Sequence, residues 1–440
     1  MSEELIHLLT KVPGIEVISW GSSTKLRGPE DLERASLHLH LSHYLRGSVR
    51  RAAGHLKIMA QLLNARDGRY LWSEIFERSP GDLREIEEQI AAAIAQKFRI
   101  SFQASSVLSE PEPGSEEQTL YVTGRFHANK RTIEGIERSV LCYEQAIAIR
   151  PGYGMAHAGL ADSYNLLMDY GARNPHRTVD LARAAARRAT QDPCATAAAA
   201  GYTSLAILSS TYDWNWAEAE ELYRRAIALD ANYATAHHWL SVDLLAPLGR
   251  FKEAWAEIAI AQRLDPLSAI IGQGRVMLCL LQRRNDDAMR ESLSLLELDP
   301  HFYMAHASMG RILTLKGEYT EAVEKYEHAR LLSLLPSPKV EGAYGHALAL
   351  AGRREEARAL LGKLIESRKT RHVPATALGI VELGLGEVEA ALTHFEAAAA
   401  DRESSACMFG VHPLYDSLRG HRRFQTVLER MGLLTVSNQP

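Results

Sequence analysis

The spacing of apolar positions changes once along the chain, at residues 104–118. This stretch, ASSVLSEPEPGSEEQ, is rich in Pro, Ser, Gly and Glu and has no apolar period, which is typical of a linker or a solvated loop. Before it, alternating apolar runs are mixed with helical spacing, and after it the spacing is helical nearly to the end. We therefore expect a small α+β domain over residues 1–103, a linker over 104–118 and a mainly α region from residue 119.

Three runs within the first domain have the alternation of strands. The second run alternates Leu56, Ile58 and Ala60 with polar positions, and the Asp67-Gly68 pair after it predicts a hairpin. The three runs cover residues 43–51, 55–63 and 70–77. The other expected elements are a helix over residues 2–11, a short strand over 17–20, a helix opened by Pro29, and a helix capped by Asp82 and Glu85 that keeps Leu83, Ile86, Ile90, Ile94 and Phe98 on one face.

After the linker the sequence repeats with a period of 34 residues. Five alanines are separated by 34, 34, 35 and 34 residues, and a second small or apolar residue follows each of them after seven positions. In four of these units a glycine five residues before the alanine marks a turn. The alanines are Ala254, Ala288, Ala322, Ala357 and Ala391, the second series is Ala261, Leu295, Ala329, Leu364 and Ala398, and the glycines are Gly249, Gly317, Gly352 and Gly386.

A period of this length fits two helices of about 12–14 residues together with their turns. Only a small side chain fits where the two helices cross closely, so we expect Ala322 and its equivalents at these crossings. A larger residue, such as Tyr223, Tyr326 or Phe395, lies between the two small ones. Because one helix pair cannot bury its apolar face alone, several pairs must stack around a shared core.

These spacings resemble those of the tetratricopeptide repeat (TPR) family over roughly residues 120–402. The unit at 303–336 matches best, with Gly310, Gly317, Tyr319, Ala322, Tyr326 and Ala329 at motif positions. The resemblance implies a mainly α fold: a TPR α-solenoid of about eight units over residues 119–402, wound as a right-handed superhelix without strands, and preceded by the small α+β domain. An insertion at 170–175 would be a longer helix or a loop, and residues 403–440 would form a capping helix and a tail. The units begin near Leu120, Gly154, Ala200, Thr235, Ala269, Tyr303, Pro338 and His372.

The first hundred residues resemble the TolB-type amino-terminal domain that precedes such arrays in bacterial regulators. The runs that carry this resemblance include YLRGSVRR at 44–51, LLNA at 62–65 and Leu71-Trp72. Members of this group usually have one more strand before the first helix, and we expect that strand to be missing here. In the family, such pairs of domains often follow a winged-helix DNA-binding domain, a nucleotide cyclase or a protein kinase, and none of these effectors is present in the sequence.

Composition and motifs exclude several functional classes. The chain has 50 Lys+Arg against 54 Asp+Glu, which argues against a protein that binds nucleic acid by neutralising phosphates. The four cysteines form no CxxC pair, and no phosphate-binding, hydrolase, metalloprotease or kinase signature is present. We therefore expect no enzyme activity, no catalytic residue, no cofactor and no metal.

Three groups of side chains carry residue types that could bind a metal ion or phosphate. The HLHLSH run, with His38, His40 and His43, favours surface or packing histidines over a zinc site. A cluster of Arg46, Arg50, Arg51 and Lys57 favours a solvated strand face over a phosphate site. The recurring His157, His238 and His306 favour packing between helices over a shared site.

The amino-terminal sequence MSEELIHLLTKVPG is acidic and amphipathic, unlike a signal peptide, and no apolar run reaches the roughly 18 residues of a membrane span. We expect a cytoplasmic location, or an extracytoplasmic one if the chain is part of a membrane-anchored regulator.

In TPR proteins the second, fifth, ninth and twelfth residues of the first helix line a concave groove. Among these positions Trp239 is the best candidate anchor, because buried aromatic residues dominate interface energies; ordinary core packing is the alternative for Trp239 and the methionines. Asp162 and Asp243 would favour a basic or amide-rich ligand. The Lys/Asn clamp of members that bind terminal carboxylates is not visible. The candidate groove residues are Met155, Asp162, Asn165, Trp239, Asp243, Gln273, Met277, Met304 and Arg311.

The sequence therefore predicts a non-enzymatic scaffold that binds a peptide or protein partner in the groove, in bacterial signalling or transcriptional regulation. The alternative is the sensory or regulatory portion of a larger effector, such as a winged-helix regulator, a nucleotide cyclase or a protein kinase. The identity of the partner and the oligomeric state do not follow from the sequence.

Overall fold

The computed structural model describes residues 41–52, 55–65, 68–78, 83–98, 115–333 and 335–434, together with 5, 6, 8, 9, 15, 17, 18, 20–23 and 26. The chain divides into two compact units. One consists of Met1–Gln118 with Gln262–Ser268, and the other of Thr119–Ala261 with Ala269–Pro440. Each unit is described by itself.

The first unit contains an antiparallel sheet whose described strands are ordered β1-β2-β3. They are β1 (His43–Ala52), β2 (His55–Asn64) and β3 (Tyr70–Arg78), so the three predicted strands are confirmed nearly to the residue. In the register Gly47 lies opposite Ala60, and the pairing of β2 with β3 shifts register between Leu62 and Leu63. Gly68 has a φ of +66°, as the predicted hairpin between β2 and β3 requires.

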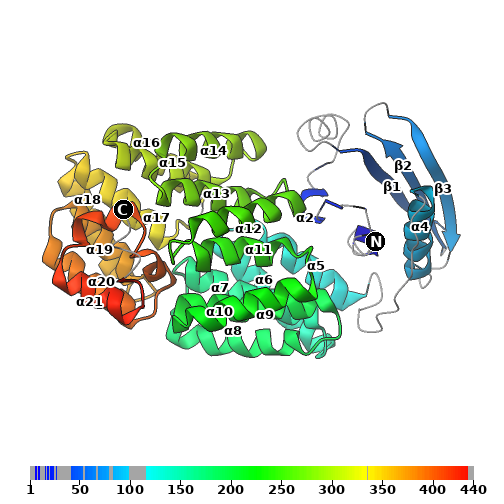
Figure 1. Cartoon of the computed structure of the whole chain (residues 1–440), viewed down its shortest axis with the longest axis horizontal. Helices are drawn as coiled ribbons and strands as arrows, with labels where there is room; N and C mark the ends of the chain where they lie inside the picture. The colour runs from blue at the N-terminus through cyan, green and yellow to red at the C-terminus, as the bar shows by residue number, and fades with distance from the viewer. Residues whose placement is uncertain are drawn as a thin grey trace. The chain divides into compact units, whose positions relative to one another are not determined.

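One face of the sheet packs against helix α4 (Leu83–Lys97), as Figure 1 shows. The alternating residues of β2 and the helical series of α4 meet in one cluster because each places its apolar positions on a single face. The core of this cluster includes Leu56, Ile58, Ala60, Leu62, Phe76, Ile86, Ile90 and Ile94.

The strand predicted at 17–20 is wrong. Val17 and Ile18 are irregular, and Trp20 begins the short helical turn α2 (Trp20–Ser23). A run of four residues that is followed by Gly21 and Ser22 is too short to form a strand by itself, because a strand needs a neighbour that completes its hydrogen-bonded ladder. The predicted Asp82 cap, the helix opened by Pro29, and His38 and His40 lie outside the described residues.

In the described part of the second unit, sixteen α-helices follow one another as eight antiparallel pairs, and no residue after 118 is in a strand. The mainly α fold class with a small sheet before it is thus confirmed. The pairs are α5 (Glu116–Ala128) with α6 (Ile133–Ile149), α7 (Gly154–Asp169) with α8 (Pro175–Thr190), α9 (Ala195–Leu208) with α10 (Trp216–Leu229), α11 (Ala234–Trp239) with α12 (Phe251–Leu264), α13 (Ala269–Leu281) with α14 (Asn285–Leu298), α15 (Tyr303–Lys316) with α16 (Tyr319–Leu331), α17 (Pro338–Leu350) with α18 (Arg354–Ser367), and α19 (Ala375–Gly384) with α20 (Val388–Ala400).

The recurring small residues are buried, as expected for positions where the two helices of a pair cross. Ala322 and its four equivalents are completely buried, and so are Tyr223 and Phe395 between the crossings. A Cβ atom on Gly310 of α15 would lie only 2.8 Å from the Tyr326 ring of α16, which explains the glycine there. The four turn glycines have φ between +71° and +84°, a region that glycine adopts without strain.

The first half of the array departs from the repeat in two ways. At the insertion, residues 170–174 form a loop between α7 and α8, and each of these two helices has 16 residues. In the next two pairs the first helix continues as a π-helix, η2 (Ser209–Asp213) after α9 and η3 (Leu240–Leu245) after α11. Single π-helical turns of this kind occur often at functional sites.

The array ends in two short 3-10 helices, η4 (Ser404–Met408) and η5 (Pro413–Leu418), and the helix α21 (Arg422–Arg430). Phe395 of α20 packs against Phe409, Tyr415 and Phe424 from these elements, so they cover the last apolar face. Among the helices that the structure describes, none is both long and apolar enough to cross a membrane.

Candidate functional site

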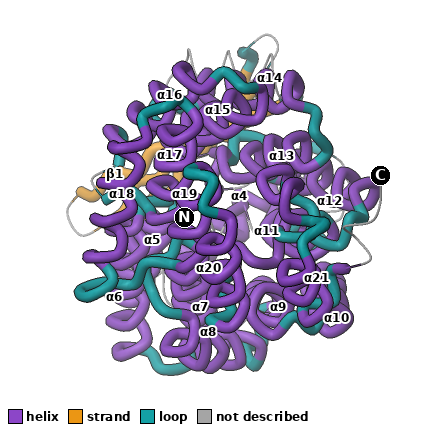
Figure 2. The backbone as a smooth tube through the Cα atoms, turned by 90° about the vertical axis from the view of Figure 1, so that its left-hand side faces the viewer, coloured by secondary structure: helices purple, strands orange, loops and turns teal. Residues whose placement is uncertain are grey.

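The concave side of the helical array contains a cavity of about 470 Å³. Its wall is built mainly by the first helix of successive pairs, α7, α11 with η3, α13, α15, α17 and α19, and it is completed by η4 and η5. Figure 2 shows these helices winding around a common axis. The 3.6-residue period turns one row of side chains from each first helix towards this axis.

The structure brings most of the predicted groove residues together. Asp162 and Asn165 line a smaller neighbouring cavity of about 30 Å³, which shares Trp239 and Asp243 with the large one. Met155 lines neither cavity and packs against the core cluster. The predicted residues that line the large cavity are Trp239, Asp243, Gln273, Met277, Met304 and Arg311.

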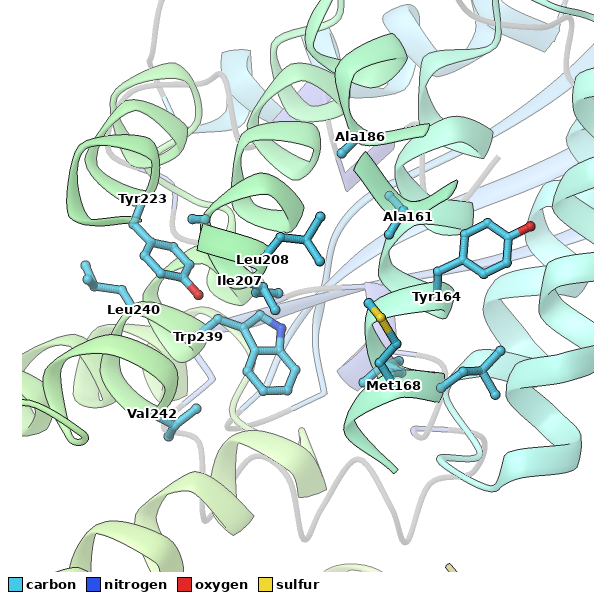
Figure 3. Close-up of a cluster of buried hydrophobic side chains, with 14 of the residues drawn as sticks. Ala161, Tyr164, Met168, Ala186, Ile207, Leu208, Tyr223, Trp239, Leu240 and Val242 are labelled. Carbon is cyan, nitrogen blue, oxygen red and sulfur yellow. The ribbon is translucent and has the colours of Figure 1, made fainter. Parts of the chain in front are cut away.

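Trp239 belongs both to the core and to the cavity wall. Only 9 % of its surface is exposed, and Figure 3 shows it near Ile207, Leu240 and Val242. Its Nε1–H has no hydrogen-bond acceptor within the described residues. The two alternatives for Trp239, core packing and site residue, are therefore compatible in this structure.

The smaller cavity offers one way to satisfy this indole. Asn165 donates from Nδ2 to the Ser204 carbonyl at 3.1 Å, which leaves its Oδ1 without a partner in the described structure. The cavity is large enough for one water molecule, which would accept from the Trp239 indole and donate to Asn165.

Two carboxylates, Asp169 and Asp243, face the large cavity. Asp169 forms an ion pair, whereas Asp243 forms none with the described residues. Asp169 Oδ1 lies 2.6 Å from the Lys339 ammonium and accepts a hydrogen bond from Ser404 at 2.9 Å. Asp243 has no hydrogen bond or ion pair with any described residue. Burial, and then the charge of Asp169, raises the pKa of Asp243 well above its ordinary value, against the smaller opposing effect of Lys339.

Another part of the wall carries amide and guanidinium groups. Gln273 donates from Nε2 to Ser308 Oγ at 2.7 Å, and its Oε1 has no partner among the described residues. Arg311 lines the cavity without an ion pair in the described structure. Burial and the charges of Arg311 and other arginines lower the pKa of His412 well below its ordinary value, so this histidine is neutral.

Contacts between the early and late pairs close the concave side. Besides the Lys339–Asp169 ion pair, the Tyr170 hydroxyl lies 3.9 Å from Met304 Sδ, and a side chain on Gly171 would collide with Pro374. The Arg402 guanidinium stacks over the Trp214 ring at 3.8 Å. These contacts span the concave side and leave the cavity partly open to solvent.

Two of the described residues that line the cavity have shifted pKa values. Burial lowers the pKa of His238 to about 3, and burial raises the pKa of the Cys407 thiol, which is therefore protonated at neutral pH. His306 stacks on His328, which agrees with a packing role. The described residues contain no group of three or more His, Cys, Asp or Glu that could hold a metal ion.

Sequence reasoning missed Asp169, Lys339 and Ser404, which close the cavity. They come from helices far apart in the chain and occupy no shared position of the repeat. The one available signal was the insertion at 170–175, because it directly follows Asp169.

Comparisons with known proteins agree with the fold. No protein-family model matches the chain. The "Putative adenylate cyclase 3" of Rhizobium meliloti (strain 1021) is 28 % identical over 165 residues, which are 37 % of this chain and 28 % of that protein. The chain thus matches little more than a quarter of this relative's length.

Among solved structures, an IFIT1 monomeric mutant with Gppp-AAAA has a TM-score of 0.50 and 13 % identity, covering 80 % of this chain and 75 % of that one. Cut9 with Hcn1, from the APC/C hetero-tetramer, has a TM-score of 0.47 and 15 % identity over 79 % and 59 % of the two chains. The second unit is a TPR-like helical solenoid. None of these comparisons identifies the TolB-type domain, which stays a prediction.

Proposed function

We propose that this chain is a non-enzymatic protein-interaction scaffold. The observation that carries the proposal is the concave wall of a TPR-like solenoid, which combines Trp239, Gln273 and the unpaired carboxylate of Asp243. Repeat solenoids use such continuous concave surfaces for recognition. A partner segment carrying Lys or Arg would place its charge at Asp243, in bacterial signalling or transcriptional regulation.

The test is to recover a partner from lysate and titrate it against three proteins. Asp243→Asn keeps the shape of the side chain and removes its charge, and we expect it to weaken binding at least ten-fold. Asp286→Asn is the matched control, because this carboxylate is exposed on α14 outside the cavity. Equal affinity of the partner for wild type and Asp243→Asn would remove the cavity from the interface.

A second candidate function is the regulatory portion of a nucleotide cyclase or another effector. The partial match to a putative adenylate cyclase supports it. The matched residues are 37 % of this chain and 28 % of that protein, so most of that protein lies outside the match. Sequencing the DNA upstream in the same frame tests this candidate. An in-frame cyclase, winged-helix or kinase region would support it, and a stop codon directly upstream would exclude an amino-terminal effector.

A further inference from the structure

One end of the large cavity combines acidic and aromatic side chains. Asp169 and Asp243 face it together with the rings of Trp239, Tyr170 and Tyr303. We propose that this end binds the ammonium group of a small organic amine, whose apolar body lies along Met277 and Met304. The inference concerns the same cavity as the scaffold proposal, but it holds whether or not a protein partner also binds.

At this end of the cavity, one of the two carboxylates has no cation paired with it among the described residues. Lys339 neutralises Asp169, whereas no described residue pairs with Asp243. Asp162 and Arg402 line the smaller cavity together with Asp243. The buried Tyr223 and Cys407 also lie near Asp243, and both are uncharged at neutral pH because burial raises the pKa of each. A carboxylate that is only partly exposed to solvent and has no partner is unfavourable, and a bound ammonium would supply the missing charge and hydrogen bonds.

The aromatic rings and methionines suit an amphipathic cation. Electron-rich rings attract organic cations at their faces, and Trp is the strongest of them. Met277 and Met304 are unbranched and adapt to an apolar body of varied shape. A mostly apolar wall with a few converging polar groups is typical of small-molecule sites.

The volume of the cavity suits a small molecule. The volume of about 470 Å³ lies in the range of about 300–1,000 Å³ that is common for small-molecule pockets. The Asp169–Lys339–Ser404 contacts join the early pair α7–α8 to the end of the array across this site. A small amine fits in this volume with these contacts intact.

Three probes of equal chain length separate charge from apolar burial: hexylammonium, 1-hexanol and hexanoate. Isothermal titration at pH 8 is expected to show at least ten-fold tighter binding of hexylammonium than of either other probe. This factor corresponds to about 1.4 kcal/mol. Asp243→Asn is expected to abolish the preference and Asp286→Asn to retain it, with circular dichroism confirming that both variants fold.

The pH dependence provides a second readout. Hexylammonium prefers the ionised carboxylate, so its affinity should rise with pH while Asp243 loses its proton, and 1-hexanol should show no such rise. The same dependence in Asp243→Asn would assign the titration to Asp169, Lys339 or another group and overturn the inference.

Other outcomes contradict the inference directly. If hexanoate binds more tightly than hexylammonium, the cavity is a site for an anion beside Arg311. If 1-hexanol binds as tightly as hexylammonium, the cavity is an apolar pocket without a cation site. Absence of binding by all three probes would also overturn it. A lysine-bearing peptide that binds while hexylammonium does not would favour the scaffold proposal alone, so the failures of the two proposals are distinguishable.

Discussion

The two halves of the helical array obey the same repeat to different degrees. From α13 to α20 the pairs keep the 34-residue spacing, and alanines such as Ala322 fill the crossings. From α7 to η3 the helices lengthen or widen into π-helices, and Trp239 and Asp243 lie at this irregular part. Regular positions therefore hold the array together, whereas departures from the repeat supply the aromatic and acidic groups of the cavity. The following variants test this division of roles.

The largest effect is expected at Trp239. Although it lines the cavity, it is 91 % buried in the core cluster, so Trp239→Ala should cost about 3–5 kcal/mol of folding free energy. Chemical denaturation followed by circular dichroism measures this cost. Leu331→Ala is the control, because that side chain is 85 % exposed and its removal should change stability by less than about 0.5 kcal/mol. Similar stability of the two variants would show that Trp239 is not part of the core.

A somewhat smaller effect is expected in the regular half. Ala322→Leu would place a larger side chain at a completely buried crossing of α15 and α16, at a cost of about 1–3 kcal/mol from forced rotamers and backbone shifts. Ala256→Leu, on the exposed face of α12, is the matched control. Thermal unfolding of the two variants at the same temperature would contradict the placement of Ala322 at a crossing.

Asp243 should change how stability depends on pH. Its pKa is raised in the folded protein, so the folded state binds more protons than the unfolded state from about pH 4 upward, and stability falls as pH rises through this window. Asp243→Asn removes this contribution and should be more stable than wild type at neutral pH, with the difference vanishing below about pH 4. Denaturation curves are measured for both proteins across this pH range. The same difference in the free energy of unfolding at every pH would refute the prediction.

The smallest effect is expected for the ion pair that closes the cavity. Both side chains of the Lys339–Asp169 pair are about one-third exposed, so Lys339→Met should cost roughly 0–1 kcal/mol. Salt screens such pairs, and the difference from wild type should shrink at high ionic strength. A cost that does not change with salt would assign the effect to packing of the Lys339 stem.

The repeat made most of the array predictable. Periodic apolar spacing identified the helices, and the fifth and ninth positions of the first helices identified Trp239, Asp243, Gln273 and Met277 as cavity residues. The closure was not predictable, because the contact between Asp169 and Lys339 joins residues 170 positions apart without a shared motif. The strand expected at 17–20 failed because local β propensity does not supply a pairing partner.

The most direct test of the account is a crystal structure of the chain soaked with hexylammonium at pH 8. The account predicts difference density for the ammonium within hydrogen-bonding distance of the Asp243 carboxylate, with the alkyl chain along Met277 and Met304. Density for the probe beside Arg311, or a cavity that contains no probe when titration shows binding, would contradict it.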